Sequence, residues 1–358
     1  MPRPPEASAR IRPMPTERRA RRIPWHTVIV LVLTAVLLWL FFRTIDLAEA
    51  WRAVRRANPW LIAAATTVTV ATYGMRALRW QTLLAPIGET HFGVAFRTTV
   101  MGFAASFLLP GRVGEVLRPY LLARQEGLRA SATFATIVVE RVLDLATVLL
   151  LFGMGLLVVN VDVGPAIRTA GWLSTAGAIG GVVFLMVLAG HPERLGRMTA
   201  SLTRWLPGRA GEALAGFAAT FAEGLKVMRS PAHLAVALAW SLPLWLALTF
   251  GVWLTSLAFG LTFPFVATFL VMGVLTVGVA APTPGGAGGF HLAYAYSVTA
   301  FFGADADTAG AAAIVLHALS FVPVTLVGLV FMWQDGLTLG RVRGLRADAG
   351  AGAGEIAT

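Results

Sequence analysis

The stretch SFLLPGRVGEVLRPY, residues Ser106–Tyr120, places three charges inside sequence that otherwise suits lipid. A Pro-Gly pair interrupts the stretch, and Arg112, Glu115 and Arg118 follow the interruption. One ionised side chain at bilayer depth costs roughly 2.5–3.5 kcal/mol on insertion scales, so these groups require partners or a ligand. The stretch therefore predicts a membrane protein with a polar interior.

The next apolar stretch, Ala132–Asn160, carries three further charges at Glu140, Arg141 and Asp144. Glu140 and Asp144 are four residues apart and share a helix face, and Arg141 is three residues from Asp144. Two acids beside one arginine repel each other unless another cation approaches, and Arg112 or Arg118 could supply it. Two interpretations remain open and can coexist: a buried charge network that fixes helix packing, or a pocket that binds a charged headgroup.

The composition places the whole chain in the membrane class. Hydrophobic residues make up 57% of the 358 residues, and the charged share of 13% is about half that of a typical soluble domain. The net charge of +11 indicates cytoplasmic loops that face anionic headgroups, because no polar domain is present to bind nucleic acid. Without cysteine, disulfides and thiolate metal sites are excluded.

The apolar runs predict an all-α polytopic membrane protein, since a helix needs about 20 apolar residues to cross the hydrocarbon core. Six full spans are expected at about 25–42, 59–76, 131–159, 171–190, 232–259 and 309–333. Two other segments, about 98–122 and 265–302, contain Pro-Gly breaks near their middle. We expect them to be re-entrant hairpins, because Pro and Gly break helices. If the hairpins cross instead, the chain has eight or more spans.

The two breaks share the frame P-G-x-x-G, which suggests an internal repeat. The frame falls on Pro110, Gly111 and Gly114 and again on Pro284, Gly285 and Gly288, with Gly286 inside the second set. Hairpins that enter from opposite faces would make the repeat inverted, the architecture that puts a transport site near the membrane midplane. Chance recurrence is the alternative, because the chain has 37 glycines and 19 prolines.

Irregular backbone at membrane depth survives only where it is buried in protein or lines a wet cavity, so the breaks are expected to border a cavity. Backbone N–H groups freed there can bind an anion such as a lipid phosphate, and arginine adds bidentate contacts. The candidate headgroup-binding residues are Arg112, Glu115, Arg118, Glu140, Arg141 and Asp144. His291, which follows the second break, is a candidate for proton coupling, with hydrogen-bonded packing as the commoner role.

No catalytic or metal-binding signature accompanies these residues. The chain lacks H-E-x-x-H and G-x-S-x-G, and the break Gly285–Gly289 lacks the Gly-Lys-Ser/Thr ending of a nucleotide loop. The six histidines are scattered. We therefore expect no catalytic residue, no metal and no cofactor, and predict that the chain is not an enzyme.

The charge distribution predicts the orientation. Residues 25–335 are expected to form one transmembrane domain, with a cytoplasmic amphipathic linker at 191–231. The ends, 1–24 and 336–358, are expected to be disordered cytoplasmic tails, since the first holds seven arginines and the second holds Arg341, Arg343 and Arg346. Basic residues usually gather in cytoplasmic loops. The loop 43–58 has four arginines but is expected on the outer side, so it is an exception. The expected location is the plasma membrane, with both termini in the cytoplasm.

The run Leu109–Arg118 (LPGRVGEVLR), followed by Glu140-Arg141 with Asp144 and by Pro282–Gly288 (PTPGGAG), resembles the transmembrane region of lysylphosphatidylglycerol synthases. That region also occurs alone, in flippase-like domain proteins, and the likeness covers about residues 25–335. The resemblance implies a domain that moves lipids between leaflets, here without the soluble synthase domain. One departure is His291, which stands where the family usually has glutamate.

The residues and the resemblance together favour a lipid translocase or lipid-binding transporter. Its partner would be a membrane phospholipid or another lipid with a phosphate-bearing headgroup. The alternative is an accessory subunit that binds lipid for a separate lipid-modifying enzyme or glycosyltransferase. A membrane-embedded enzyme is a third hypothesis, in which Glu140, Asp144 or His291 would act as acid or base.

Overall fold

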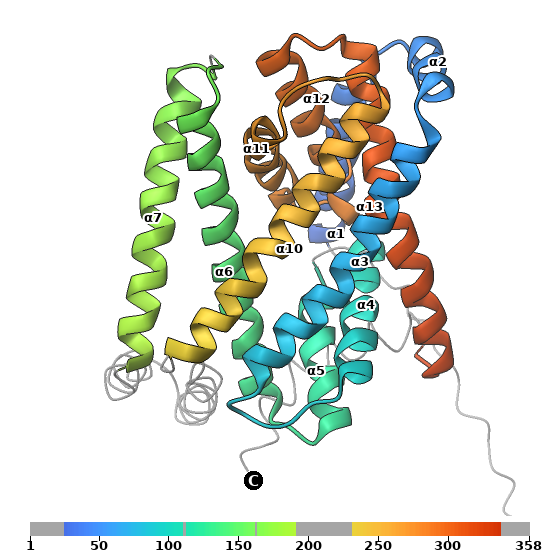
Figure 1. The fold of residues 1–358 in the computed structure, drawn as a ribbon. Coiled ribbons are helices and arrows are strands. Elements are labelled where there is room, and N and C mark those ends of the chain that lie inside the picture. Colours follow the sequence, from blue (N-terminus) through green and yellow to red (C-terminus); the bar gives the residue numbers. More distant parts are fainter. Residues whose placement is uncertain (1–24, 110–111, 162, 191–230, 338–358) are drawn as a thin grey trace, which may run out of the picture.

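The computed structural model describes residues 25–109, 112–161, 163–190 and 231–337, and every regular element in them is a helix. The predicted all-α class is therefore confirmed for this part of the chain. Long helices run much of the length of the molecule, and shorter ones pack between and around them (Figure 1). The predicted tails, apart from residues 336–337, and most of the linker lie outside the described residues, as do Pro110 and Gly111 of the first break.

The helices follow one another without a strand between them in the described residues. In chain order they are α1 (Trp25–Phe42), α2 (Leu47–Arg56), α3 (Pro59–Leu84), α4 (Phe92–Leu108), α5 (Gly114–Glu126), α6 (Ala130–Val158), α7 (Pro165–Gly190), α10 (Pro231–Ala258), α11 (Thr268–Ala280), α12 (Gly289–Phe302) and α13 (Ala306–Gln334), with the 3-10 turns η2 (Phe265–Ala267) and η3 (Pro284–Gly286).

Four helices in the described residues are long and apolar enough to cross a membrane: α3, α6, α10 and α13. Helices α1 and α2 form a fifth candidate as a bent pair, with an angle of 77° between them. Several candidate membrane spans are thus present, while six crossings, like the alternative of eight or more, stay a prediction. Helix α3 continues to Leu84, beyond the predicted end of that span at about residue 76.

Asparagine and aspartate side chains cap three helices at one end of the molecule. Asp46 accepts backbone N–H groups at the start of α2, and Asn58 does the same for α3. Asp305 caps α13, and hydrogen bonds from the backbone N–H and hydroxyl of Thr308 lower the pKa of its carboxyl. Asp307 accepts the backbone N–H of Asp46 at 2.6 Å, which ties α2 to α13.

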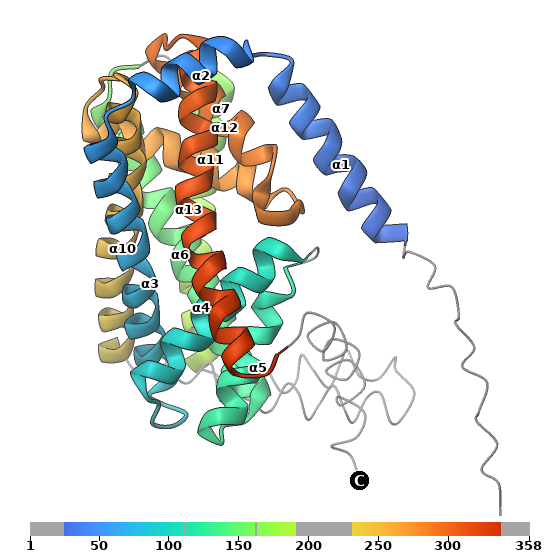
Figure 2. The ribbon, with the colours of Figure 1, turned by 90° about the vertical axis from the view of Figure 1, so that its right-hand side faces the viewer.

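Two helical hairpins occupy the middle of the fold. Helices α4 and α5 pack against each other around the break at 109–113, and α11 and α12 do so around the break at 281–288. Their four helices have 13–17 residues, fewer than the roughly 20 apolar residues that a spanning helix usually needs. Figure 2 shows the hairpins entering from opposite ends of the molecule, with their breaks pointing toward each other.

Glycines stand where the two arms of each hairpin come closest. A Cβ on Gly114 would collide with the carbonyl oxygen of Gly102 across the first hairpin. In the second hairpin, a Cβ on Gly289 would collide with the carbonyl oxygen of Gly278. Both hairpins therefore depend on direct backbone contact, which only glycine permits.

The second break depends on left-handed backbone. Pro284 starts η3, and Gly285, Gly286 and Gly288 have φ angles of 59°, 69° and 82°, which glycine adopts without a Cβ penalty. In the first break Arg112 has a φ of 51°, the only positive φ of a non-glycine residue in the described part of the chain. An arginine held in this conformation marks a constrained position.

We expect Gly114→Ala to lower the free energy of unfolding by roughly 3 kcal/mol, because the added methyl group must push the two backbones apart. Gly289→Ala should have a similar effect in the second hairpin. Thermal unfolding of the detergent-solubilised protein measures both. The matched control is Gly93→Ala, also near a helix start, where a Cβ meets nothing within 4 Å. Equal stability of Gly114→Ala and Gly93→Ala would contradict the packing described here.

Candidate functional site

A cavity of about 130 Å³ lies where the tips of the two hairpins meet. Arg112, Glu115, Arg118 and Arg141 line it on one side, and the second break lines it on the other with Thr283, Gly285 and Gly286. The hairpins also touch directly, since Arg112 Nη2 donates a hydrogen bond to the carbonyl oxygen of Val279 at 2.9 Å. Both breaks thus border one cavity.

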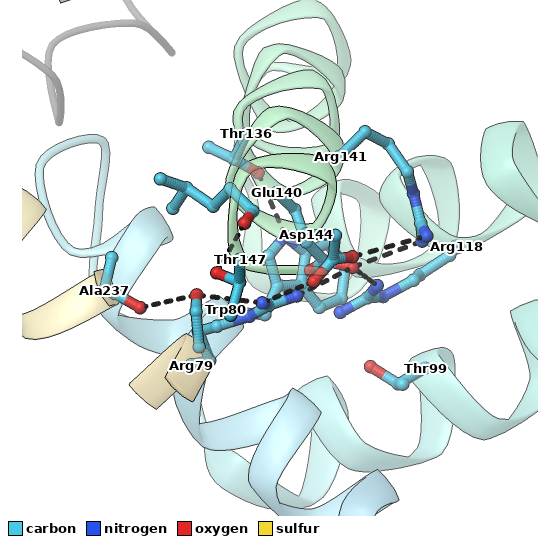
Figure 3. Close-up of polar contacts among 12 residues, drawn as sticks. Arg79, Trp80, Thr99, Arg118, Thr136, Glu140, Arg141, Asp144, Thr147 and Ala237 are labelled. Atoms are coloured by element: carbon cyan, nitrogen blue, oxygen red, sulfur yellow. Dashed lines mark hydrogen bonds and ion pairs between the residues drawn. The ribbon is translucent and has the colours of Figure 1, made fainter. Parts of the chain in front are cut away.

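Two carboxylates on α6 hold a cluster of arginines beside this cavity (Figure 3). Arg118 Nη1 donates to Glu140 Oε1 at 2.9 Å, which brings α5 against α6. Arg141 reaches both acids, with Nη2 at 3.3 Å from Glu140 Oε1 and Nη1 at 3.5 Å from Asp144 Oδ2. Glu115 Oε1 lies 4.0 Å from Arg141 Nε and 3.6 Å from Arg112 Nη1, so all six candidate residues form one connected network.

Arg79 on α3 completes the network, and the sequence analysis missed it. Its Nη1 lies 2.6 Å from Asp144 Oδ1 and 3.1 Å from Ser241 Oγ on α10, and its Nη2 lies 3.6 Å from Glu140 Oε1. Trp245 Nε1, also on α10, donates to the same oxygen of Asp144 at 2.9 Å. The two acids of α6 thus bind α3, α5 and α10 together.

Arg79 was missed because the span expected at about 59–76 ended before it. That boundary placed the arginine outside the membrane. A signal was present, since Arg76 and Arg79 are three residues apart and the apolar sequence continues to Leu84. Arg76 is buried too, and its guanidinium lies 5.0 Å from the ring centroid of Phe103, a cavity-lining residue. The sequence of Pro59–Leu84 is therefore compatible with one long span that contains two buried arginines.

The six candidate residues divide by exposure. Arg118, Glu140 and Asp144 are buried, with Arg118 only 3% exposed. The side chains of Arg112, Glu115 and Arg141 are 47%, 36% and 39% exposed, so a ligand can reach them. Arg112 and Glu115 form the ion pair expected from their spacing, at 3.6 Å. The three buried side chains are suited to hold the helices together. The three exposed side chains are suited to bind a ligand in the cavity.

Several buried donors around the cavity have no hydrogen-bond partner. They are Nε and Nη2 of Arg118, Nε of Arg141 and Oγ1 of Thr283. A buried donor without an acceptor loses roughly 1–3 kcal/mol, and more if it is charged. All three residues line the cavity. An anion with several acceptor oxygens would satisfy them.

The histidines of the second break are engaged in hydrogen bonds. His291 Nδ1 accepts the backbone N–H of Gly288 at 3.3 Å, which requires that nitrogen to be unprotonated. His317 Nε2 lies 2.9 Å from the carbonyl oxygen of Gly285, and the two imidazole rings are 4.5 Å apart. This geometry fits the packing role weighed for His291, and proton coupling stays a prediction. Gly288 packs against Leu37 of α1 and does not line the cavity.

No group of three or more His, Cys, Asp or Glu side chains that could hold a metal ion occurs in the described residues.

Comparison with known proteins gives three matches. Residues 27–328 match the family described as the lysylphosphatidylglycerol synthase TM region. A UPF0104 membrane protein from Methanothermobacter thermautotrophicus is 27% identical over 87% of this chain and 92% of its own length. The glycosyltransferase AglD from Haloferax volcanii is 29% identical over 35% of this chain, which covers 20% of that protein.

We expect Asp144→Asn to lower the free energy of unfolding by about 3–5 kcal/mol, because it leaves the buried Arg79 without its closest anion. Unfolding in mixed detergent micelles measures the change. Glu49→Gln is the control, since Glu49 pairs with Arg52 on the surface and should contribute about 0–1 kcal/mol. If both variants lose the same small amount, the network does not hold the helices together.

Proposed function

We propose that this chain, which belongs to the family of the lysylphosphatidylglycerol synthase transmembrane region, is a membrane lipid translocase or lipid-binding transporter. A phosphate-bearing headgroup would enter the cavity between the two hairpins. One observation carries the proposal: arginines with unpaired donors line a cavity between two broken helices in the middle of the molecule. The match over residues 27–328 confirms the resemblance drawn from the sequence motifs.

The exposed arginines would make the first contact with the headgroup. Arg112 and Arg141 are accessible, and their planar guanidinium groups match the geometry of phosphate oxygens. Arg118 would contribute its two unpaired nitrogens from deeper in the protein. Glu115 balances charge at the entrance through its pair with Arg112.

The packing supports an inverted repeat as part of this proposal. Helix α4 of the first hairpin packs on α13, and α11 of the second hairpin packs on α6. Helices α3 and α10, which precede the two hairpins, pack on each other. In an inverted repeat, α3, α4, α5 and α6 would correspond in order to α10, α11, α12 and α13. Under this correspondence the contact between α4 and α13 becomes the contact between α11 and α6, and both contacts are present. Rocking of one repeat against the other would expose the cavity to each leaflet in turn.

An accessory subunit is the second candidate. Its specific support is the partial similarity to a protein named glycosyltransferase AglD, which suggests that such a membrane region can accompany an enzyme. The arrangement of acids favours transport over catalysis by the chain itself. Glu140 and Asp144 both lie among arginines, and a carboxylate so paired is a poor general base.

Loss of the exposed arginines tests the transport site. We expect Arg112→Ala combined with Arg141→Ala to slow transfer of a labelled phospholipid between liposome leaflets by roughly tenfold or more, because charge-assisted hydrogen bonds contribute about 1.5–3 kcal/mol each. The control is Arg55→Ala with Arg124→Ala, which removes two exposed arginines outside the cavity. Unchanged transfer by the cavity variant would remove this site from the proposal.

The outcome also separates the two candidates. Wild-type protein that binds phospholipid but never accelerates transfer, and that co-purifies with an enzyme, favours the accessory role.

The proposed orientation places the turn between α5 and α6 in the cytoplasm, at the plasma membrane. The chain has no cysteine, so single substitutions can be labelled with a membrane-impermeant thiol reagent. We expect Ala306→Cys, at the start of α13, to react in intact cells. Gln125→Cys, near the end of α5, should react only after permeabilisation. The reverse pattern would contradict the orientation.

A further inference from the structure

The charged side chains around the cavity do not balance. In the described residues, five arginines and three carboxylates line the cavity or interact electrostatically with those that do. They are Arg76, Arg79, Arg112, Arg118 and Arg141, against Glu115, Glu140 and Asp144. The sum leaves two positive charges in excess.

The first excess charge belongs to Arg76. This arginine is buried on α3, within electrostatic range of Asp144, Arg79 and Arg141. It forms no ion pair with a carboxylate in the described residues, and its guanidinium lies over the ring of Phe103 instead. Phe103 lines the cavity, so Arg76 acts on the cavity from behind one layer of side chain.

The second excess charge is shared within the cluster on α6. Three arginines, Arg79, Arg118 and Arg141, compete for two carboxylates. All three lie within 4 Å of the same oxygen, Glu140 Oε1. Nε and Nη2 of Arg118 have no hydrogen-bond partner, although Arg118 is 97% buried, and Glu140 Oε2 has none either.

An uncompensated charge at this depth is expensive. Two unit charges about 5 Å apart interact by roughly 3 kcal/mol at an effective dielectric of about 20, so a bound anion recovers much of that cost. A headgroup with one negative charge would leave one arginine charge uncompensated. A group with two negative charges would balance the cavity.

The cavity has room for a phosphate group, with a volume of about 130 Å³. Because the side chains of Arg112, Glu115 and Arg141 on its wall are partly exposed, the rest of a headgroup can extend beyond it. The charge balance is therefore the observation that favours a phosphate at the end of the lipid.

We propose that the cavity selects lipids that end in a phosphomonoester, whose phosphate carries close to two negative charges, over phosphodiester lipids with one. This inference rests on the proposed function and names the substrate class of the same site. Arg118, Arg141 and Thr283 would donate to the terminal oxygens, and Arg76 would supply long-range attraction without touching the ligand.

Two lipids with identical acyl chains test the selection. Native mass spectrometry of the purified full chain at pH 8 compares binding of phosphatidic acid, a phosphomonoester, with that of phosphatidylglycerol, a phosphodiester. We expect phosphatidic acid to bind about tenfold more tightly. Inorganic phosphate is the third probe, and competition by it at millimolar concentration would show that the terminal phosphate itself is recognised.

The variant that isolates the charge excess is Arg76→Gln. It should weaken binding of phosphatidic acid more than binding of phosphatidylglycerol, because the phosphomonoester carries the larger negative charge, and so reduce the preference to about threefold or less. Arg124→Gln, which removes an exposed arginine at the end of α5, should keep the wild-type preference. The wild-type comparison decides the matter if Arg76→Gln does not fold.

Equal binding of the two lipids by the wild-type protein overturns the inference and leaves the transport proposal standing. If the protein clearly prefers phosphatidic acid but transfers neither lipid between leaflets, the inference holds and the transport proposal fails.

Discussion

Ionised carboxylates inside an apolar helix bundle are the constraint on which this fold depends. Glu140 and Asp144 lie on α6, surrounded by helices long and apolar enough to cross a membrane. Their negative charge is tolerated there only if cations come to them, and arginines from α3 and α5 do so. Because these partners belong to different helices, the electrostatic requirement also determines how the bundle assembles.

A second constraint acts on the backbone at the two breaks. A helix interrupted in mid-membrane exposes backbone groups that lipid cannot satisfy. Here the two interrupted segments shelter each other, since Arg112 of one donates to the carbonyl oxygen of Val279 in the other. Backbone contact at Gly102 and Gly114, and again at Gly278 and Gly289, keeps each hairpin narrow enough to fit between the long helices.

A charge network that stabilises the fold and a pocket that binds a headgroup are two parts of one arrangement in this structure. The buried side of the network, with Arg79, Glu140 and Asp144, joins four helices. Its exposed side, with Arg112 and Arg141, faces the cavity. Positive charge in excess of what the acids neutralise connects the two, because a framework built with surplus arginines attracts an anion.

The sequence alone determined the membrane class, the breaks of the two hairpins and most of the charged cluster. These features depend on apolar length, on Pro-Gly punctuation and on the cost of charge in lipid, all of which act locally along the chain. Only the tertiary structure decided that Arg79 pairs with Asp144, 65 residues away, and that Arg76 faces the cavity through Phe103. No local pattern encodes these contacts, because which helices become neighbours depends on the packing energy of the whole bundle.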